Sequence, residues 1–375
     1  MRGFVNVPYK EVENLEEIIL HLRAKVEKAK LSAQGNIAEE LVGTLSYLDP
    51  GKRHYAEGRT PGNDKDSFSV SEIQTAAKLP EELQVKYLRY RYRFNHYPKY
   101  GIVADFPIVL GIEPASVCNL KCVMCFQADK TFSGDKKYMG LMDFELYKKV
   151  IDEGADNDLC SIVLASRGEP TLHKQLPEMI AYARQKGILD IKINTNATRL
   201  TPELSRRMLQ AFGKHGVNTV VFSIDSADKE EFERIRVGAN FDQIVENIKN
   251  FHKIRTEEFP DAAVRTRISM TILEKFHQSV EKARGFWPNM VDEFGYKKAN
   301  ERLDIYSHEV TQGARWCNLL FERVYVWYDG TINPCDEDYK SKLTPGNAKD
   351  KSIKEVWLGE HMQNYRRLHK EKLKN

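Results

Sequence analysis

The sequence lacks the features of an exported or membrane-spanning protein. Its first ten residues contain no apolar signal-peptide core, and no run of 18 apolar residues occurs anywhere. The net charge is only +3, so the large positive excess of a dedicated nucleic-acid binder is also missing. These absences predict a soluble, cytoplasmic protein with no membrane partner, and they argue against a nucleic-acid partner.

Cysteine is scarce. The 375 residues contain six, at positions 118, 122, 125, 160, 317 and 335. A chain of this length buries a large core without a disulfide framework, so the grouping of the cysteines favours metal ligation in a reducing compartment. Three of them lie in Cys-Asn-Leu-Lys-Cys-Val-Met-Cys, directly after the apolar run 107–113. This C-x3-C-x2-C spacing cannot place three side chains on one face of a helix or strand, which argues against three merely buried thiols.

Three thiolates are one too few for a closed zinc site or an ordinary Fe–S cluster, both of which take four protein ligands. A [4Fe–4S] cluster held by Cys118, Cys122 and Cys125 would keep one iron without a protein ligand, and that iron could bind another molecule. A zinc site completed by a distant His or Cys stays open as the structural alternative.

The chain from residue 107 onward alternates between strand-like and helix-like segments. The predicted strands are 107–113, 160–165, 189–194, 217–224, 264–271 and 302–307. The predicted helices lie near 143–154, 173–186, 202–213, 242–255 and 275–287. This alternation predicts repeated βαβ units and an α/β fold with a parallel sheet of about six strands.

The first hundred residues are predicted to be mainly helical. Residues 11–48 carry apolar side chains at helical spacing. A later stretch, Lys86–Lys99, is rich in Arg and Tyr and has no acidic residue. Basic and aromatic residues together can bind nucleic acid or a phosphorylated substrate. We favour the alternative, a half-buried helix whose aromatic rings pack on the next domain while its arginines stay in solvent.

The cysteine loop resembles the signature of the radical S-adenosylmethionine (SAM) enzymes. The resemblance implies that Cys118, Cys122 and Cys125 hold a [4Fe–4S] cluster whose open iron chelates the amino and carboxylate groups of SAM. Reductive cleavage then yields a 5′-deoxyadenosyl radical that abstracts a hydrogen atom from a substrate. The family fold is a partial (β/α)6 TIM-like barrel, which matches the six predicted units and would carry its functional groups at the C-terminal strand ends.

Later strand ends resemble further elements of this family. Ser166-Arg-Gly-Glu-Pro170 is similar to its Gly-Gly-Glu-Pro element near the SAM ammonium, with Arg167 in place of the first glycine. Asn194–Thr198 is similar to a segment near the ribose, and Phe222–Ser226 with Arg236 to the carboxylate site. The resemblance implies SAM contacts from Gly168, Glu169, Asn194, Asn196, Ser223, Asp225 and Arg236, with Met124 and Phe126 near the adenine.

The C-terminal segment carries a second pattern. Cys317 and Cys335 flank Asp329-Gly330, a strong hairpin signal between β-rich runs. With the following basic helix, this resembles the hairpin-plus-helix of SPASM and twitch domains, which hold auxiliary Fe–S clusters. Two cysteines do not complete a four-ligand site. Substitution by Asp336, Asp338 or His361, a cap without a cluster, and a disulfide all stay open. Cys160 is predicted to be a small buried residue in a strand.

The predicted domains are a helical N-terminal extension at 1–100, a radical SAM partial barrel at 101–310 and a twitch/SPASM-like cap at 311–375. The expected function is an oxidoreductase-type radical SAM reaction on a small polar metabolite such as a sugar or sugar nucleotide, by oxidation or epimerisation. A peptide-modifying maturase is the first alternative, and a non-catalytic binding protein stabilised by zinc or an Fe–S cluster is the second. Flavodoxin or ferredoxin is the expected electron donor. Polar substrate groups are expected among Asp304, Tyr306, His308 and Glu309.

Overall fold

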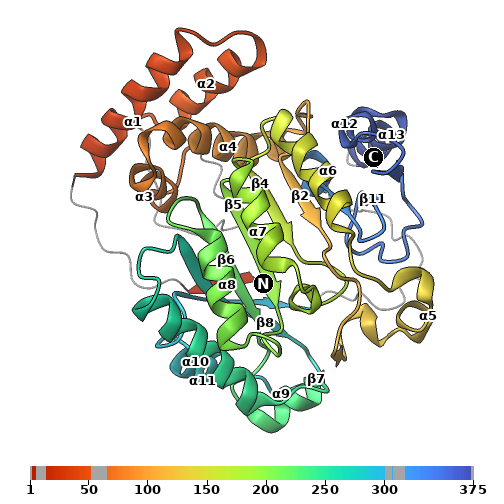
Figure 1. Ribbon diagram of the computed structural model, residues 1–375. Coiled ribbons are helices and arrows are strands. Elements are labelled where there is room, and N and C mark those ends of the chain that lie inside the picture. Colours follow the sequence, from red (N-terminus) through yellow and green to blue (C-terminus); the bar gives the residue numbers. More distant parts are fainter. Residues whose placement is uncertain (1, 6–13, 52–65, 300–305, 307–316, 373–375) are drawn as a thin grey trace. The chain divides into compact units, whose positions relative to one another are not determined.

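The computed structural model describes residues 2–5, 14–51, 66–299, 306 and 317–372 (Figure 1). The chain divides into two compact units, one of residues Asn6–Ala104 and one of Met1–Val5 with Asp105–Asn375. Within the described residues, no helix is both long enough and apolar enough to cross a bilayer.

The smaller unit is helical throughout its described part. Its helices are α1 (Leu15–Lys30), α2 (Gly35–Tyr47), α3 (Val70–Lys78) and α4 (Glu81–Tyr100). The apolar positions Ile19, Leu22 and Val26 form one buried stripe along α1, as their spacing predicts. The helical character predicted for this part of the chain is therefore confirmed for the residues that the structure describes.

The Arg/Tyr stretch lies on α4 and is part of the interior of this unit. The Tyr92 ring lies 5.1 Å from that of Tyr47 on α2. Two of its arginines pair with acids of the same unit, Arg89 with Glu40 at 2.8 Å and Arg91 with Glu72 at 2.7 Å. The prediction that the arginines stay in solvent was therefore wrong. Guanidinium groups this deeply packed need carboxylate partners, and α2 and α3 provide them.

The larger unit is built on a ten-stranded sheet in the order β1-β9-β8-β6-β5-β4-β2-β10-β11-β12. Six neighbouring strands run parallel: β2 (Val109–Ile112), β4 (Ser161–Leu164), β5 (Asp190–Thr195), β6 (Asn218–Ser223), β8 (Val264–Ile272) and β9 (Glu293–Lys298). The helices that connect them are α6 (Phe144–Asp156), α7 (Leu176–Gln185), α8 (Pro202–Phe212), α9 (Lys229–Ile235), α10 (Phe241–Glu257) and α11 (Val280–Phe286). The predicted α/β fold with a partial (β/α)6 barrel is confirmed.

The strands show why the core forms between the sheet and its helices. Along β5, Ile191 and Ile193 are fully buried, whereas Lys192 and Asn194 point to the opposite face and are partly exposed. This period-two alternation gives the sheet one apolar face, and α6, α7 and α8 lie along the sheet (Figure 1). The other face, which we call the inner face, carries polar groups.

Two features of the sheet differ from the sequence-based prediction. The sixth parallel strand is β9, whereas the predicted strand 302–307 falls outside the described residues except for Tyr306, which is in a turn. The first strand, β1 (Arg2–Val5), pairs antiparallel with β9 and so lies with the barrel rather than with the helical extension. A four-residue strand carries too little periodicity to be recognised from sequence, because its partner supplies the hydrogen bonds.

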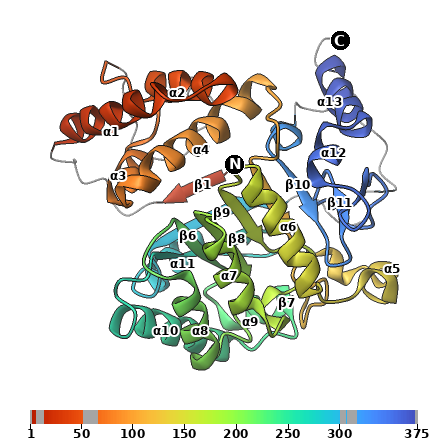
Figure 2. The same cartoon turned by 45° about the horizontal axis from the view of Figure 1, so that its top comes forward.

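The C-terminal part continues the same sheet. β10 (Arg323–Val326) pairs parallel with β2 and antiparallel with β11 (Thr331–Asn333), which in turn pairs with β12 (Gly346–Asn347). Gly330 closes the hairpin with φ of 89°, a conformation that glycine adopts readily. The helices α12 (Ile353–Leu358) and α13 (Glu360–Lys372) follow this hairpin (Figure 2). The predicted hairpin-plus-helix is confirmed, and its hairpin is anchored on the first barrel strand.

Candidate functional site

The three clustered cysteines lie in the loop that follows β2. Cys122 belongs to the two-residue strand β3 (Lys121–Cys122), which pairs antiparallel with β7 (Arg236–Val237), so that Cys122 lies opposite Arg236. Cys125 begins a short 3-10 helix, and its sulfur accepts a hydrogen bond from the Gln127 amide at 3.5 Å. Cys118 and Cys125 are partly buried and Cys122 is buried. The loop therefore presents its thiols in a shielded position beside β7.

Polar groups from other strand ends reach two of these sulfurs. Arg236 Nη1 lies 3.7 Å from Cys122 Sγ, and Asn196 Nδ2 lies 3.9 Å from Cys118 Sγ. Donors of this kind stabilise the negative charge of a thiolate and tune the potential of a bound cluster. Burial raises the pKa of Cys118 to about 12 and that of Cys122 to about 11, although Arg236 acts to lower the latter. Metal binding therefore has to displace protons from these thiols.

Three thiols from one loop are a donor set that a cubane cluster can use. In the part of the chain that the structure describes, no three His, Cys, Asp or Glu side chains are arranged to hold one metal ion. A single zinc ion needs its ligands to converge on one point. In a [4Fe–4S] cluster each thiolate binds a different iron, so three sulfurs from one loop can serve without converging. Cys118, Cys122 and Cys125 are the residues that would hold such a cluster.

The segment after β4 packs directly against the cysteine loop. The Glu169 amide donates to the Val117 carbonyl at 2.9 Å. A β-carbon on Gly168 would lie only 2.3 Å from the Ala115 carbonyl oxygen and 2.4 Å from that of Val117. Glycine is therefore required at position 168 by the close approach of two backbones.

The Glu169 carboxylate is buried and bonded to the end of β5. Its Oε1 accepts from the Thr171 and Thr195 hydroxyls at 2.5 and 2.6 Å, and its Oε2 accepts from the Asn196 amide at 2.7 Å. Burial raises the pKa of Glu169, although these hydrogen bonds act to lower it. Within the described residues Oε2 accepts a single hydrogen bond, so it keeps the capacity to accept another from a bound ammonium group.

Arg236 forms the other polar side of the site. Its Nη2 pairs with Asp225 Oδ2 at 2.8 Å, and Asp225 Oδ1 accepts from the Thr271 amide at 2.8 Å. Burial raises the pKa of Asp225, and Arg236 acts against this rise. Among the described residues, the buried Arg236 Nε and Asn194 Oδ1 have no hydrogen-bond partner. Such orphaned groups are costly in an interior, and a polar ligand or an ordered water at this place would satisfy them.

Comparison with known sequences identifies both parts of this unit. Residues 112–272 match the Radical SAM superfamily, and residues 317–375 match SPASM, an iron-sulfur cluster-binding domain. The chain is a radical SAM enzyme with a SPASM domain. The resemblance drawn from the cysteine loop is thereby confirmed, and the cofactors of its radical SAM domain are a [4Fe–4S] cluster and SAM.

Curated relatives and a solved structure extend this comparison. The chain is 24% identical over 301 residues to the tungsten-containing aldehyde ferredoxin oxidoreductase cofactor-modifying protein of Pyrococcus furiosus, covering 67% of this chain and 81% of that protein. It is 36% identical over 108 residues to Fe-coproporphyrin III synthase of Methanosarcina barkeri, covering 29% of this chain and 25% of that protein. Its fold is similar to that of Streptococcus suis SuiB bound to the precursor peptide SuiA, with a TM-score of 0.55, 16% identity and coverage of 98% and 90%.

The remaining residues predicted to contact SAM occupy different surroundings. Ser223 ends β6 at a partly buried position, and Met124 lies partly buried within the cysteine loop. Phe126 is 2% exposed and stacks on Tyr339 of the SPASM domain, with ring centroids 5.1 Å apart. The ring of Phe126 is thus engaged in packing between the two domains. Its role near the adenine, like that of Met124, stays a prediction.

The SPASM domain contains Cys317 and Cys335 as free, partly buried cysteines, so the disulfide alternative is not what the structure shows. Asp338, proposed as a substitute ligand, is instead buried and bonded. Its Oδ1 accepts from the Tyr306 hydroxyl at 2.7 Å and its Oδ2 from the Leu343 amide at 2.7 Å. Tyr306 therefore helps to hold this domain together. The other predicted substrate residues, Asp304, His308 and Glu309, lie outside the described residues.

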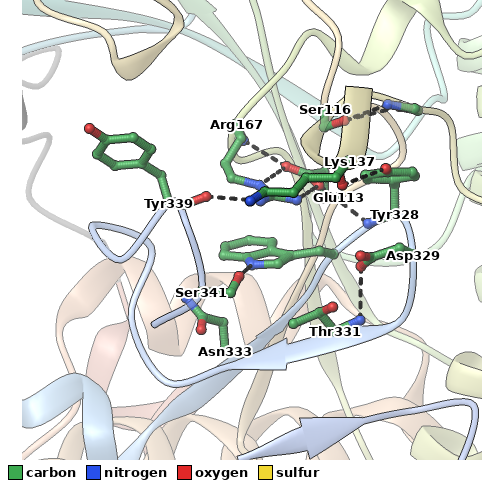
Figure 3. Close-up of polar contacts among 12 residues, drawn as sticks. Glu113, Ser116, Lys137, Arg167, Tyr328, Asp329, Thr331, Asn333, Tyr339 and Ser341 are labelled. Atoms are coloured by element: carbon green, nitrogen blue, oxygen red, sulfur yellow. Dashed lines mark hydrogen bonds and ion pairs between the residues drawn. The ribbon is translucent and has the colours of Figure 1, made fainter. Parts of the chain in front are cut away.

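Arg167 and Glu113 form a buried ion pair with contacts at 2.5 and 2.8 Å (Figure 3). This pair is absent from the sequence-based prediction, in which Arg167 is a departure from the family pattern and Glu113 has no role. A signal was present, because an acid at the end of an apolar strand is costly unless it is paired.

Proposed function

We propose that this enzyme binds SAM through the open iron of a cluster held by Cys118, Cys122 and Cys125 and starts a radical reaction on a small, polar, anionic metabolite such as a sugar nucleotide. When bound, the cluster supplies the electron that splits SAM into methionine and a 5′-deoxyadenosyl radical. One observation carries the proposal: the segments that follow β4, β5 and β6 converge on the cysteine loop, through Gly168, Asn196 and Arg236.

The chain's own residues supply the SAM-binding groups. Oε2 of Glu169 can accept a hydrogen bond from the SAM ammonium. The Arg236 guanidinium can donate to the SAM carboxylate, because its Nε has no partner within the described residues. Asp225 keeps this guanidinium in place at 2.8 Å. Asn194, whose side-chain oxygen is orphaned, is a candidate for the ribose, and Ser223 for the carboxylate.

The substrate class follows from the charge on the inner face of the sheet. Three cations lie on this face: Lys192 on β5, Arg267 on β8 and Lys297 on β9. Residues that pair across neighbouring strands share a face, as do residues two apart on one strand. The pairings Lys192–Thr219, Val221–Arg267 and Thr271–Lys297 therefore place all three cations on the same side of the sheet. Within the described residues, Lys192 makes no hydrogen bond or salt bridge. Burial and the charges of Arg267 and Arg323 lower its pKa to about 8. Two acids, Asp190 and Glu293, lie on the same face, and Glu293 is 3.8 Å from Arg267, but the cations outnumber them. An excess of positive charge favours a phosphate- or carboxylate-bearing substrate.

A peptide substrate is the alternative. SuiB, which was solved with its precursor peptide, has a similar fold, but at 16% identity this likeness extends to the fold alone. Oxidation or epimerisation is our proposed outcome for the small metabolite, with flavodoxin or ferredoxin as electron donor. Side-by-side turnover with anionic sugar nucleotides, neutral sugars and peptides separates the alternatives, since only a true substrate raises the rate of 5′-deoxyadenosine formation.

The test is an anaerobic assay. The protein is reconstituted with iron and sulfide, mixed with SAM and dithionite, and analysed for 5′-deoxyadenosine by mass spectrometry. Cys125→Ala should abolish the product, whereas Cys160→Ala, a matched change at a buried cysteine preceding β4, should retain it. Zinc at one equivalent in anaerobically purified protein, with no 5′-deoxyadenosine after reconstitution, would overturn the proposal in favour of a non-catalytic binding protein.

A further inference from the structure

Arg167 and Glu113 form an ion pair at the ends of two neighbouring barrel strands. Glu113 directly follows β2, and Arg167 follows β4 by three residues. The Glu113 side chain is 0% exposed and the Arg167 side chain is 2% exposed. Arg167 Nε donates to Glu113 Oε1 at 2.8 Å, and Nη2 donates to Oε2 at 2.5 Å, so that the contact is bidentate (Figure 3).

Both partners also bond to the SPASM hairpin. Arg167 Nη1 donates to the Tyr339 carbonyl at 3.0 Å, and the Tyr328 amide donates to Glu113 Oε2 at 3.2 Å. The guanidinium carbon lies 4.4 Å from the centre of the Trp327 ring, and the Trp327 Nε1 donates to the Ser341 hydroxyl at 2.8 Å. The ion pair thus connects the ends of two barrel strands with the turn between β10 and β11, through Tyr328, and with the loop after β11, through Tyr339.

The same arginine reaches the segment that follows the cysteine loop. Its carbonyl accepts from Gln127 Nε2 at 2.6 Å, and its guanidinium lies 5.5 Å from the Phe132 ring. The Tyr339 hydroxyl donates to Asp129 Oδ2 at 2.8 Å. Arg167 therefore lies where the barrel, the residues after Cys125 and the SPASM domain meet.

A buried ion pair is poorly suited to raising stability, because removing two charges from water costs about as much as their attraction returns. Apolar side chains of similar volume would fill this space, but the Arg167 and Tyr328 amides and the Tyr339 carbonyl would lose their partners. A planar guanidinium donates its hydrogen bonds in fixed directions, and here three of its nitrogens donate to three oxygens at 2.5–3.0 Å. These hydrogen bonds therefore fix the position of the Tyr339 segment relative to the ends of the two barrel strands.

We propose that Arg167 is a positioning residue that fixes the SPASM hairpin, including the Cys335 segment, against the loop that follows Cys125. Asn333 transmits this placement, because its Nδ2 donates to the Cys335 carbonyl at 2.7 Å and to the Asp338 carbonyl at 2.8 Å. The relation between the two cysteine-bearing segments is then set by the ion pair. This inference rests on the proposed function only in that the first segment holds the catalytic cluster.

The experiment compares three variants of the full chain, reconstituted with iron and sulfide, by hydrogen–deuterium exchange. Glu113→Leu/Arg167→Met replaces the pair with apolar groups. Arg167→Lys keeps a charge beside Glu113 but cannot serve both Glu113 and the Tyr339 carbonyl. Arg206→Met is the matched control, because it removes an exposed bidentate pair with Glu258 on the barrel surface.

The double variant should unfold below the wild-type temperature, because the Arg167 and Tyr328 amides and the Tyr339 carbonyl lose their partners. It should still fold and retain the iron bound by the first cluster, while amide exchange over residues 339–343 rises by about tenfold or more. Arg167→Lys should raise exchange at 339–343 and leave the Tyr328 amide protected. Arg206→Met should change neither. Wild-type protection of 339–343 in a folded double variant would overturn the proposal. If the double variant does not fold, unchanged exchange in Arg167→Lys overturns it.

These measurements are independent of turnover. If the wild-type protein forms no 5′-deoxyadenosine while the exchange pattern is as expected, the proposed function fails and the positioning role of Arg167 stands.

Discussion

Cys122 and Arg236 face each other across a pair of two-residue antiparallel strands, and the Arg236 Nη1 lies 3.7 Å from the Cys122 sulfur. One arginine thereby touches a predicted cluster ligand and, through Nη2, the buried carboxylate of Asp225, which lies just after β6. A single side chain therefore couples the loop proposed to hold the cluster with the groups proposed to hold SAM.

Replacement of this arginine tests its role in SAM binding. Arg236→Lys keeps the charge beside Asp225 but loses the fork of donors, so the KM for SAM should rise about 10- to 100-fold, as expected for loss of a charged hydrogen bond of roughly 1.5–3 kcal/mol. Iron content should stay at the wild-type level. The rate of 5′-deoxyadenosine formation against SAM concentration measures the effect. An unchanged KM would mean that Arg236 only supports the loop.

Gly168 is constrained by space rather than by its φ angle. In Gly168→Ala the new methyl group would meet the carbonyl oxygens of Ala115 and Val117 at 2.3 and 2.4 Å, and backbone cannot move aside as a flexible side chain can. The unfolding free energy should fall by about 1–3 kcal/mol, with loss of bound iron. Gly285→Ala on α11 is the control, because a β-carbon at that position would have no other atom within 4 Å. Thermal melts and iron assays report both effects, and equal behaviour of the two variants would contradict the expected crowding.

Lys192 provides a pH test of the inner face. Its pKa is lowered to about 8 by burial and by Arg267 and Arg323, whereas an unfolded lysine titrates near 10.5. Between these values the unfolded chain binds more protons, so the folded protein gains stability relative to Lys192→Met as the pH rises from about 8 to 10.5. Binding of an anionic sugar nucleotide should weaken over the same rise through pH 8, because the lysine loses its charge.

Calorimetry of wild type and Lys192→Met across this pH range measures both effects. Parallel stability curves would show that Lys192 titrates normally. A binding curve that keeps its pH dependence in Lys192→Met would place the responsible group elsewhere.

The SPASM domain gives a prediction about a second cluster. The Asp338 carboxylate is already bonded to Tyr306 and to backbone amides. Cys317 and Cys335 are then the thiols of the domain that can bind iron. If an auxiliary cluster forms with further ligands, Cys317→Ala/Cys335→Ala should lose about four irons per chain and retain those of the first cluster. Iron and sulfide analysis beside Cys160→Ala decides the question, and an unchanged iron content would exclude a cluster at these cysteines.

The parts that the sequence predicted well depend on local pattern. The C-x3-C-x2-C spacing indicates a metal-binding loop, because three thiols at this spacing cannot all lie on the buried face of one helix or strand. The first five parallel strands were located because each is either a short apolar run, as in β2, or alternates polar and apolar residues, as in β5 and β8. The hairpin at Asp329-Gly330 was located because few residues accept the required φ, and Gly330 has 89°.

The tertiary structure decided what depends on residues far apart in the chain. β1 forms only because β9, almost 300 residues later, offers an edge. Arg167 and Glu113 are separated by 54 residues. The apolar run before Glu113 indicates that this acid needs a partner, but nothing near either residue in sequence indicates which partner it is. Sequence alone determined that this chain holds an iron–sulfur cluster and SAM, because both are bound by short motifs. Only the folded chain showed that Arg167, which stands where the family pattern has glycine, connects the barrel to the SPASM domain. The free energy of burying a charge depends on the partners that folding brings to it.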